Sequence, residues 1–153
     1  MKIDKEEKSP FENMFQIGVV VKDMDRAIEQ LTQLGLGPFK LKMPPPEARD
    51  TFRGKPFIPA DSVLIKSTQM GNVELELIQP TQGASPHKEY LDAKGEGIQH
   101  VAFAVKDLDS ELDKLTKKGA SILLQSDRKS QGGVVYLDLN AAGLIVELVK
   151  RPK

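Results

Sequence analysis

The sequence predicts an α+β fold in which a βαβββ module is used twice. The first observation is an internal repeat: residues 16–35 match residues 100–119 at an offset of 84, with seven of 20 positions identical. The second is that each copy opens with a short apolar strand and continues into an amphipathic helix. The third is that the two halves end alike, in NVELELIQP (72–80) and GLIVELVKRP (143–152). Such a repeat is typical of a duplicated structural unit.

The chain length of 153 residues fits one domain. We expect that domain to cover residues 12–153, with the first module at about 14–80 and the second at about 98–150. Residues 1–11 carry many charges and few apolar side chains, so a disordered tail is predicted there.

Charge and composition exclude several classes of protein. Lys plus Arg and Asp plus Glu both number 22, so the net charge is zero, which argues against partners such as nucleic acids or anionic membranes. No apolar run approaches the roughly 20 residues that span a bilayer. The chain has no cysteine, which excludes disulfides, thiolate metal sites and cysteine nucleophiles. A cytoplasmic location is expected.

The elements of the repeat follow from local chemistry. Residues 15–21 form a Val- and Ile-rich strand, Asp23 is the N-cap of the following helix, and Gly35 stands where a C′ glycine belongs. In the second copy the strand covers 98–105, and Asp107 caps the second helix.

The remaining elements complete both modules. A hairpin is predicted from SVLIKS and NVELELIQ, followed by a short helix through 87–94. His87 is expected to be a surface loop histidine. The last strands are expected near residues 122–124, 134–138 and 144–150. Residues 43–60 contain five prolines and are predicted to be one long irregular stretch, either a lid or binding loop or a surface excursion without a role.

Alternation along the strands identifies a cleft-facing set of polar residues. Gln16 and His100 open the first strand of each half, and small residues follow them on the same face. Glu147 is a carboxylate in a closing strand that is apolar on both faces, where an unpaired charge would be costly. Glu76 is on the closing strand of the first half. Alternatively, Gln16 and Glu76 are exposed edge residues and His100 is a hydrogen-bonded core histidine.

These four residues form a candidate metal site. An imidazole, two carboxylates and an amide oxygen suit a divalent ion such as Zn²⁺, with Co²⁺, Ni²⁺ or Mn²⁺ as alternatives. The four predicted ligands are Gln16, Glu76, His100 and Glu147.

The segments IGVVVKDMDRAI, VELELIQP, GEGIQHVAFAV and GLIVEL resemble the vicinal oxygen chelate superfamily, and within it the methylmalonyl-CoA epimerases. The resemblance implies a curved mixed sheet around a metal-binding cleft, with the same four residues as ligands. It also implies an epimerase or isomerase that removes an α-proton through a metal-stabilised enolate, with Glu147 as a base. The implied substrate is an acyl-CoA or a 2-keto acid, and a homodimer is expected.

The sequence departs from the epimerases at the second acid/base. The glutamate of those enzymes aligns with Ala60, so Asp61 and Glu47 are the candidates for this role. A glyoxalase I-like lyase is an alternative that Gln16 favours, although ELIQP lacks the asparagine of its glutathione site. A non-catalytic binding protein of the bleomycin-resistance type is the third possibility.

Overall fold

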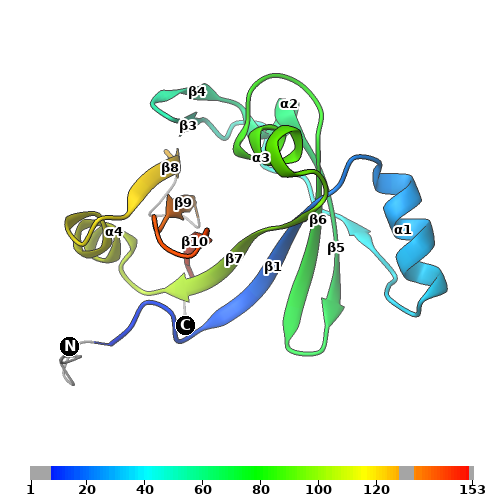
Figure 1. Ribbon diagram of the computed structural model, residues 1–153, viewed down its shortest axis with the longest axis horizontal. Helices are drawn as coiled ribbons and strands as arrows, with labels where there is room; N and C mark the ends of the chain where they lie inside the picture. The colour runs from blue at the N-terminus through cyan, green and yellow to red at the C-terminus, as the bar shows by residue number, and fades with distance from the viewer. Residues whose placement is uncertain (1–7, 128–132, 152–153) are drawn as a thin grey trace.

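The computed structural model describes residues 8–127 and 133–151. Ten strands form one mixed sheet with the order β2-β5-β6-β1-β7-β10-β9-β8-β3-β4. The sheet is strongly curled, with the helices α1 and α4 outside its two ends (Figure 1). This confirms the predicted α+β fold with tandem βαβββ modules. In the described part of the chain, no helix is long and apolar enough to cross a membrane.

The first module forms one half of the sheet. Its elements are β1 (Met14–Val20), α1 (Met24–Gln33), β2 (Lys40–Leu41), β5 (Val63–Met70) and β6 (Val73–Pro80). The Asp23 side chain accepts a hydrogen bond from the backbone N–H of Arg26, as expected of an N-cap. Gly35 follows the helix with φ +97°, a conformation that favours glycine.

The second module forms the other half in the same way. Its elements are β7 (Gly97–Val105), α4 (Leu108–Lys117), β8 (Ser121–Ser126), β9 (Val134–Asp138) and β10 (Ile145–Lys150). The opening strands of the two modules, β1 and β7, pair antiparallel at the centre, and each pairs parallel with the closing strand of its own module. The duplication therefore brings all four of these strands together in the middle of the sheet.

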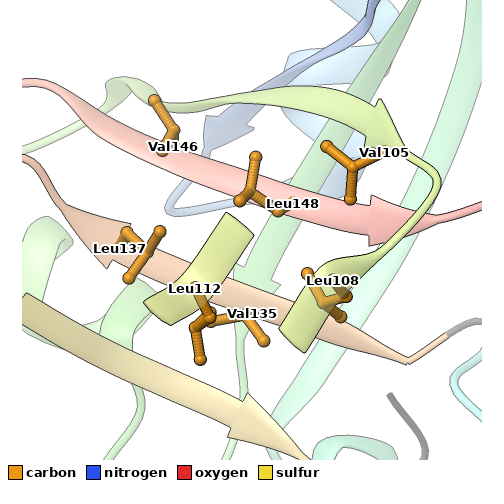
Figure 2. Packing of buried hydrophobic residues seen from close by; sticks show 7 residues of the cluster. All are labelled: Val105, Leu108, Leu112, Val135, Leu137, Val146 and Leu148. Carbon is orange, nitrogen blue, oxygen red and sulfur yellow. The ribbon is translucent and has the colours of Figure 1, made fainter. Parts of the chain in front are cut away.

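The apolar core lies between the sheet and the two helices. One cluster joins α4 to β7, β9 and β10, and Figure 2 shows its members: Val105, Leu108, Leu112, Val135, Leu137, Val146 and Leu148. A second cluster packs α1 against β1 and β6 through Met24, Leu75 and Leu77. Both helices occupy one face of the sheet, so the opposite face is left for the cleft.

The prediction that residues 43–60 are irregular is wrong in part. It contains β3 (Asp50–Phe52), β4 (Lys55–Phe57) and the start of α2 (Pro59–Ser62). The hairpin leaves the first module and pairs with β8 of the second, where Pro56 is accommodated on the edge strand β4. The predicted short helix is present as α3 (Pro86–Lys94). Most of the predicted disordered tail, residues 1–7, lies outside the described residues.

Candidate metal centre and active site

The four predicted ligands come from four adjacent strands and point to the face opposite the helices. Gln16 is on β1, Glu76 on β6, His100 on β7 and Glu147 on β10. Each of the four residues is at most 6% exposed. This burial rules out the alternative in which Gln16 and Glu76 are exposed edge residues.

Gly18 makes room for the histidine. It is the register partner of Glu76 on one side and of His100 on the other. A Cβ atom at this position would lie 2.0 Å from His100 Cε1 and 2.4 Å from both ring nitrogens. The His100 ring therefore occupies the space that a side chain at position 18 would take.

Ala102 has the corresponding place in the next row. It is the register partner of Gln16 on β1 and of Glu147 on β10, and it is fully buried. Because its side chain is a single methyl group, the two longer side chains can extend over it. The small residues that follow each polar residue thus form the floor of the site, as the alternation predicts.

The polar atoms of the set form a chain of contacts. Gln16 Nε2 donates to Glu76 Oε2 at 2.9 Å, and Gln16 Oε1 lies 3.2 Å from His100 Nε2. His100 Nε2 lies 2.9 Å from Glu147 Oε2, yet this oxygen makes no hydrogen bond of acceptable geometry to any described residue. A buried carboxylate oxygen without a hydrogen bond is costly, so it marks a place where a partner belongs.

Gln99 orients the histidine. Its Oε1 lies 2.6 Å from His100 Nδ1, so the nitrogen is the donor. The register of β7 against β1 shifts between Gly18 and Val19, which leaves Gln99 as an extra residue, a β-bulge. The bulge explains how two consecutive residues reach the same site. It also leaves Nε2 facing two oxygens, those of Gln16 and Glu147, an arrangement that a cation stabilises.

These three atoms fit a divalent ion in chemistry and in spacing. Metal–ligand bonds of about 2.1 Å place neighbouring ligands of an octahedral ion about 3.0 Å apart, close to the observed 2.9 and 3.2 Å. Among the described residues, however, no three His, Cys, Asp or Glu side chains form a group that could hold a metal ion. The fourth predicted ligand, Glu76, is linked to this group by its hydrogen bond from Gln16, and it also forms an ion pair with a side chain of the protein.

Lys42 is the cation that pairs with Glu76. Its Nζ lies 2.9 Å from Glu76 Oε2 and 2.8 Å from Glu74 Oε1. Burial acts to lower the pKa of Lys42, but the two carboxylates outweigh it and raise that pKa. The pKa of Glu76 is raised by burial and then by Glu147, against the effect of Lys42. A metal ion that bound Glu76 Oε2 would have to compete with the Lys42 ammonium for that oxygen.

The site opens into a cavity of about 480 Å³. Tyr136 and His87 lie on its wall, with His87 Nε2 3.1 Å from the Tyr136 hydroxyl. The prediction of a surface histidine at 87 is wrong: the residue is 4% exposed, because α3 packs its first turn onto the sheet. Burial lowers the pKa of His87 to about 3. Burial also raises the pKa of Tyr136, and the negative charge of Glu147 raises it further. Both side chains are therefore neutral near pH 7.

The two residues that the sequence suggested as a second acid/base do not line the cavity. Asp61, on α2, and Glu47 are both exposed, and neither lines the cavity. Their catalytic role remains a prediction. Asp50 does line the cavity, together with other residues of the stretch 43–60, as expected if that stretch is a binding loop.

Comparisons with known proteins agree with this architecture. The family model of the glyoxalase/bleomycin resistance protein/dioxygenase superfamily matches residues 15–136. The chain belongs to this superfamily. A relative in Bacillus subtilis (strain 168), the uncharacterized protein YqjC, is 31% identical over 83 residues, which are 52% of this chain. The match covers 59% of YqjC.

Three solved structures share the fold of this chain. The methylmalonyl-CoA epimerase of Mycobacterium tuberculosis has a TM-score of 0.66 at 21% identity, covering 96% of this chain and 93% of that one. A variant of the Streptomyces coelicolor methylmalonyl-CoA epimerase in complex with 2-nitronate-propionyl-CoA has a TM-score of 0.67 at 22% identity, covering 92% and 98%. A hypothetical protein of Bacillus halodurans C-125 is equally similar, with a TM-score of 0.66 at 20% identity and coverage of 92% and 95%. At this identity the likeness shows the fold.

Four functional candidates of this superfamily member were missed in the sequence. They are Lys42, Asp50, Gln99 and Tyr136. Tyr136 carried a signal, because it lies in the predicted strand 134–138, where it pairs with Glu147 and shares its face. Lys42 carried none, because it precedes the stretch 43–60 that is a candidate binding loop. Asp50 and Gln99 depend on a long-range strand pairing and on a bulge, which no local pattern announces.

Proposed function

We propose that this chain is an isomerase of the methylmalonyl-CoA epimerase type, which inverts the carbon next to a thioester carbonyl by removing and returning a proton. The observation that carries the proposal is Glu147: a buried carboxylate whose Oε2 lacks a hydrogen bond within the described residues and faces a cavity. A carboxylate in this position can accept a proton from a bound substrate, because its Oε2 makes no hydrogen bond to a described residue even though His100 Nε2 lies 2.9 Å away.

The proposed metal ligands are Gln16, Glu76, His100 and Glu147. The support is the convergence of Gln16 Oε1, His100 Nε2 and Glu147 Oε2 at spacings typical of neighbouring ligands. A divalent ion held there would supply positive charge to the substrate carbonyl oxygen while the neighbouring carbon loses its proton. Zn²⁺ is the first choice for this donor set.

The rim of the cavity favours an anionic substrate. Lys150 and Arg151 line the cavity, and Lys42, which also lines it, is paired with Glu74 and Glu76. The Arg151 guanidinium lies 3.7 Å from the centre of the Phe15 ring, which holds the cation over that side of the opening. An acyl-CoA carries phosphates that such cations attract, and a cavity of about 480 Å³ accommodates its acyl end.

Deuterium incorporation tests the proposal. Protein loaded with Zn²⁺ is incubated with methylmalonyl-CoA, and with other 2-substituted acyl-CoAs, in D₂O, and the mass of the recovered thioester is measured. We expect one deuterium at C2, and a rate at least about 10²-fold lower for Glu147→Gln. Glu29→Gln, an exposed carboxylate on α1, is the matched control and should exchange at the wild-type rate.

Two outcomes would contradict the proposal. One is the absence of exchange above the buffer rate with every acyl-CoA on metal-loaded protein, which would leave a glyoxalase I-like lyase or a small-molecule-binding protein. The other is a Glu147→Gln variant that exchanges as fast as the wild type, which would remove Glu147 from the reaction.

A further inference from the structure

The β3–β4 hairpin carries a carboxylate from the first module into the half of the cavity formed by the second. It leaves the first module between β2 and β5 and pairs through β3 with β8, with Asp50 opposite Ser126. The pairing joins residues about 75 positions apart in the chain, and it fixes Asp50 on a strand rather than on a free loop.

The environment of Asp50 is that of a functional carboxylate. The residue is 8% exposed and lines the same cavity as Glu147. One of its oxygens accepts a hydrogen bond from the Ser126 side chain, while Oδ1 is buried and has no hydrogen bond to any described residue. Leaving a buried carboxylate oxygen unsatisfied has a free-energy cost that a purely structural residue would not need to carry.

Strand register places Asp50 and Glu147 on the same face of the sheet but on different walls. Glu147 is the register partner of Tyr136, which partners Leu124, which in turn partners Phe52. Asp50 is two residues from Phe52 on β3 and so shares its face. Three strand spacings separate β10 from β3, about 14 Å along the sheet. Both carboxylates line the cavity, and because the sheet curls (Figure 1), their strands β3 and β10 lie at different places around it.

We propose that Asp50 is the second acid/base of the reaction, acting on the face of the substrate carbon opposite Glu147. This inference rests on the proposed function. In one direction, Glu147 accepts the α-proton as the C–H bond breaks, and the electron pair moves toward the carbonyl group. Protonated Asp50 then donates its proton to the other face, a new C–H bond forms there, and Asp50 becomes a carboxylate. In the reverse direction the two groups exchange roles, so no oxidant or further reactant is needed.

The protonation behaviour of Asp50 suits this role. Burial raises its pKa to about 6, with an opposing effect from the Ser126 hydrogen bond and a further rise from Asp127. A carboxyl group that titrates near neutral pH is present in both protonation states, which a group that alternately donates and accepts a proton requires. Asp61 and Glu47 do not meet the geometric condition, since neither lines the cavity.

The test separates proton removal from inversion. Asp50→Asn keeps the size of the side chain but cannot take up or deliver the proton. The separate 2R and 2S epimers of methylmalonyl-CoA are each incubated in D₂O with Zn²⁺-loaded protein, and both deuterium content and configuration at C2 are followed. We expect Asp50→Asn to lose inversion by at least about 10²-fold, yet to exchange deuterium from one epimer within about threefold of the wild-type rate. Glu147→Gln should lose exchange from that same epimer.

The retained exchange also shows that the variant is folded, and two further variants sharpen the result. Asp50→Glu should restore part of the inversion. Asp25→Asn, an exposed carboxylate on α1 that does not line the cavity, is the matched control and should invert as the wild type does.

Several outcomes overturn the inference. If Asp50→Asn inverts at the wild-type rate, Asp50 is not the second acid/base, while the proposed function stands. If Asp50→Asn loses exchange from both epimers, a role confined to one face is excluded. If Asp61→Asn loses inversion and Asp50→Asn does not, the role belongs to Asp61. If the wild type exchanges neither epimer, the proposed function fails and this inference falls with it.

Discussion

The substitution Gly18→Ala tests the geometry of the site by adding one carbon atom beside the His100 ring. The added Cβ would lie 2.0 Å from His100 Cε1, whereas ordinary contact begins at 3.4 Å. The imidazole must therefore retreat by about 1.4 Å, which is several times the roughly 0.2 Å tolerance of a metal–ligand bond. Since His100 Nε2 now lies 2.9 Å from Glu147 Oε2 and 3.2 Å from Gln16 Oε1, a shift of this size separates the three atoms.

Two magnitudes follow for Gly18→Ala. Overpacking costs about 1–3 kcal/mol, and alanine in a strand recovers about 0.5–1 kcal/mol of backbone entropy relative to glycine. The free energy of unfolding should thus fall by up to about 2.5 kcal/mol, measured by urea denaturation. Affinity for Zn²⁺, measured by calorimetric titration, should fall by at least about tenfold.

A double-mutant cycle supplies the control. In the His100→Ala background the ring is gone, so Gly18→Ala should be neutral or stabilising by about 0.5–1 kcal/mol. The reasoning would be refuted if Gly18→Ala alone unfolded no more easily than the wild type and bound Zn²⁺ with unchanged affinity. It would also be refuted if the substitution cost the same free energy with and without the ring.

Three further predictions address the core, the pH dependence and the internal cation. Leu148→Ala, at a fully buried position of the α4 cluster, should lower the free energy of unfolding by about 2–5 kcal/mol in urea denaturation. Leu144→Ala, at a 49% exposed position, should lower it by less than about 0.5 kcal/mol. Equal losses in the two variants would contradict the packing described. The pKa of Asp50 is raised to about 6 in the folded chain, so the folded state binds more protons than the unfolded state between about pH 4 and 6. The stability of the wild type relative to Asp50→Asn should therefore fall by up to about 3 kcal/mol as the pH rises through that window. A stability difference that does not depend on pH would refute this prediction. Lys42→Met should tighten Zn²⁺ binding at least about tenfold in calorimetric titrations, because the ammonium 2.9 Å from Glu76 Oε2 no longer competes for that carboxylate; weaker binding would show that Lys42 supports the ion.

The sequence predicts those parts of the molecule whose signal is local or repeated. The duplication places the opening strands of both modules, and the two-residue period of a strand assigns Gln16 and His100 to the cleft face. Glu147 is recognisable because a lone carboxylate stands among apolar neighbours. The structure brings these residues together because β1 and β7 pair at the centre of the sheet.

The features that the sequence does not predict depend on distant partners. The β3–β4 hairpin forms only against β8, which follows it by some 70 residues, and its prolines argue locally against strands. His87 is buried by packing near Tyr136, 49 positions further along the chain. Gln99 reaches His100 through a bulge that breaks the alternation on which the assignment of faces relies.

The central claim is that residues from both modules form one divalent metal site, and metal content tests it most directly. Wild type and Glu147→Ala are purified without chelator, and bound metal per chain is measured by mass spectrometry, with added Zn²⁺, Co²⁺, Ni²⁺ or Mn²⁺ if the protein is empty. We predict about one equivalent in the wild type and almost none in Glu147→Ala. A wild type that takes up none of these ions, or a variant that keeps the full equivalent, would contradict the claim.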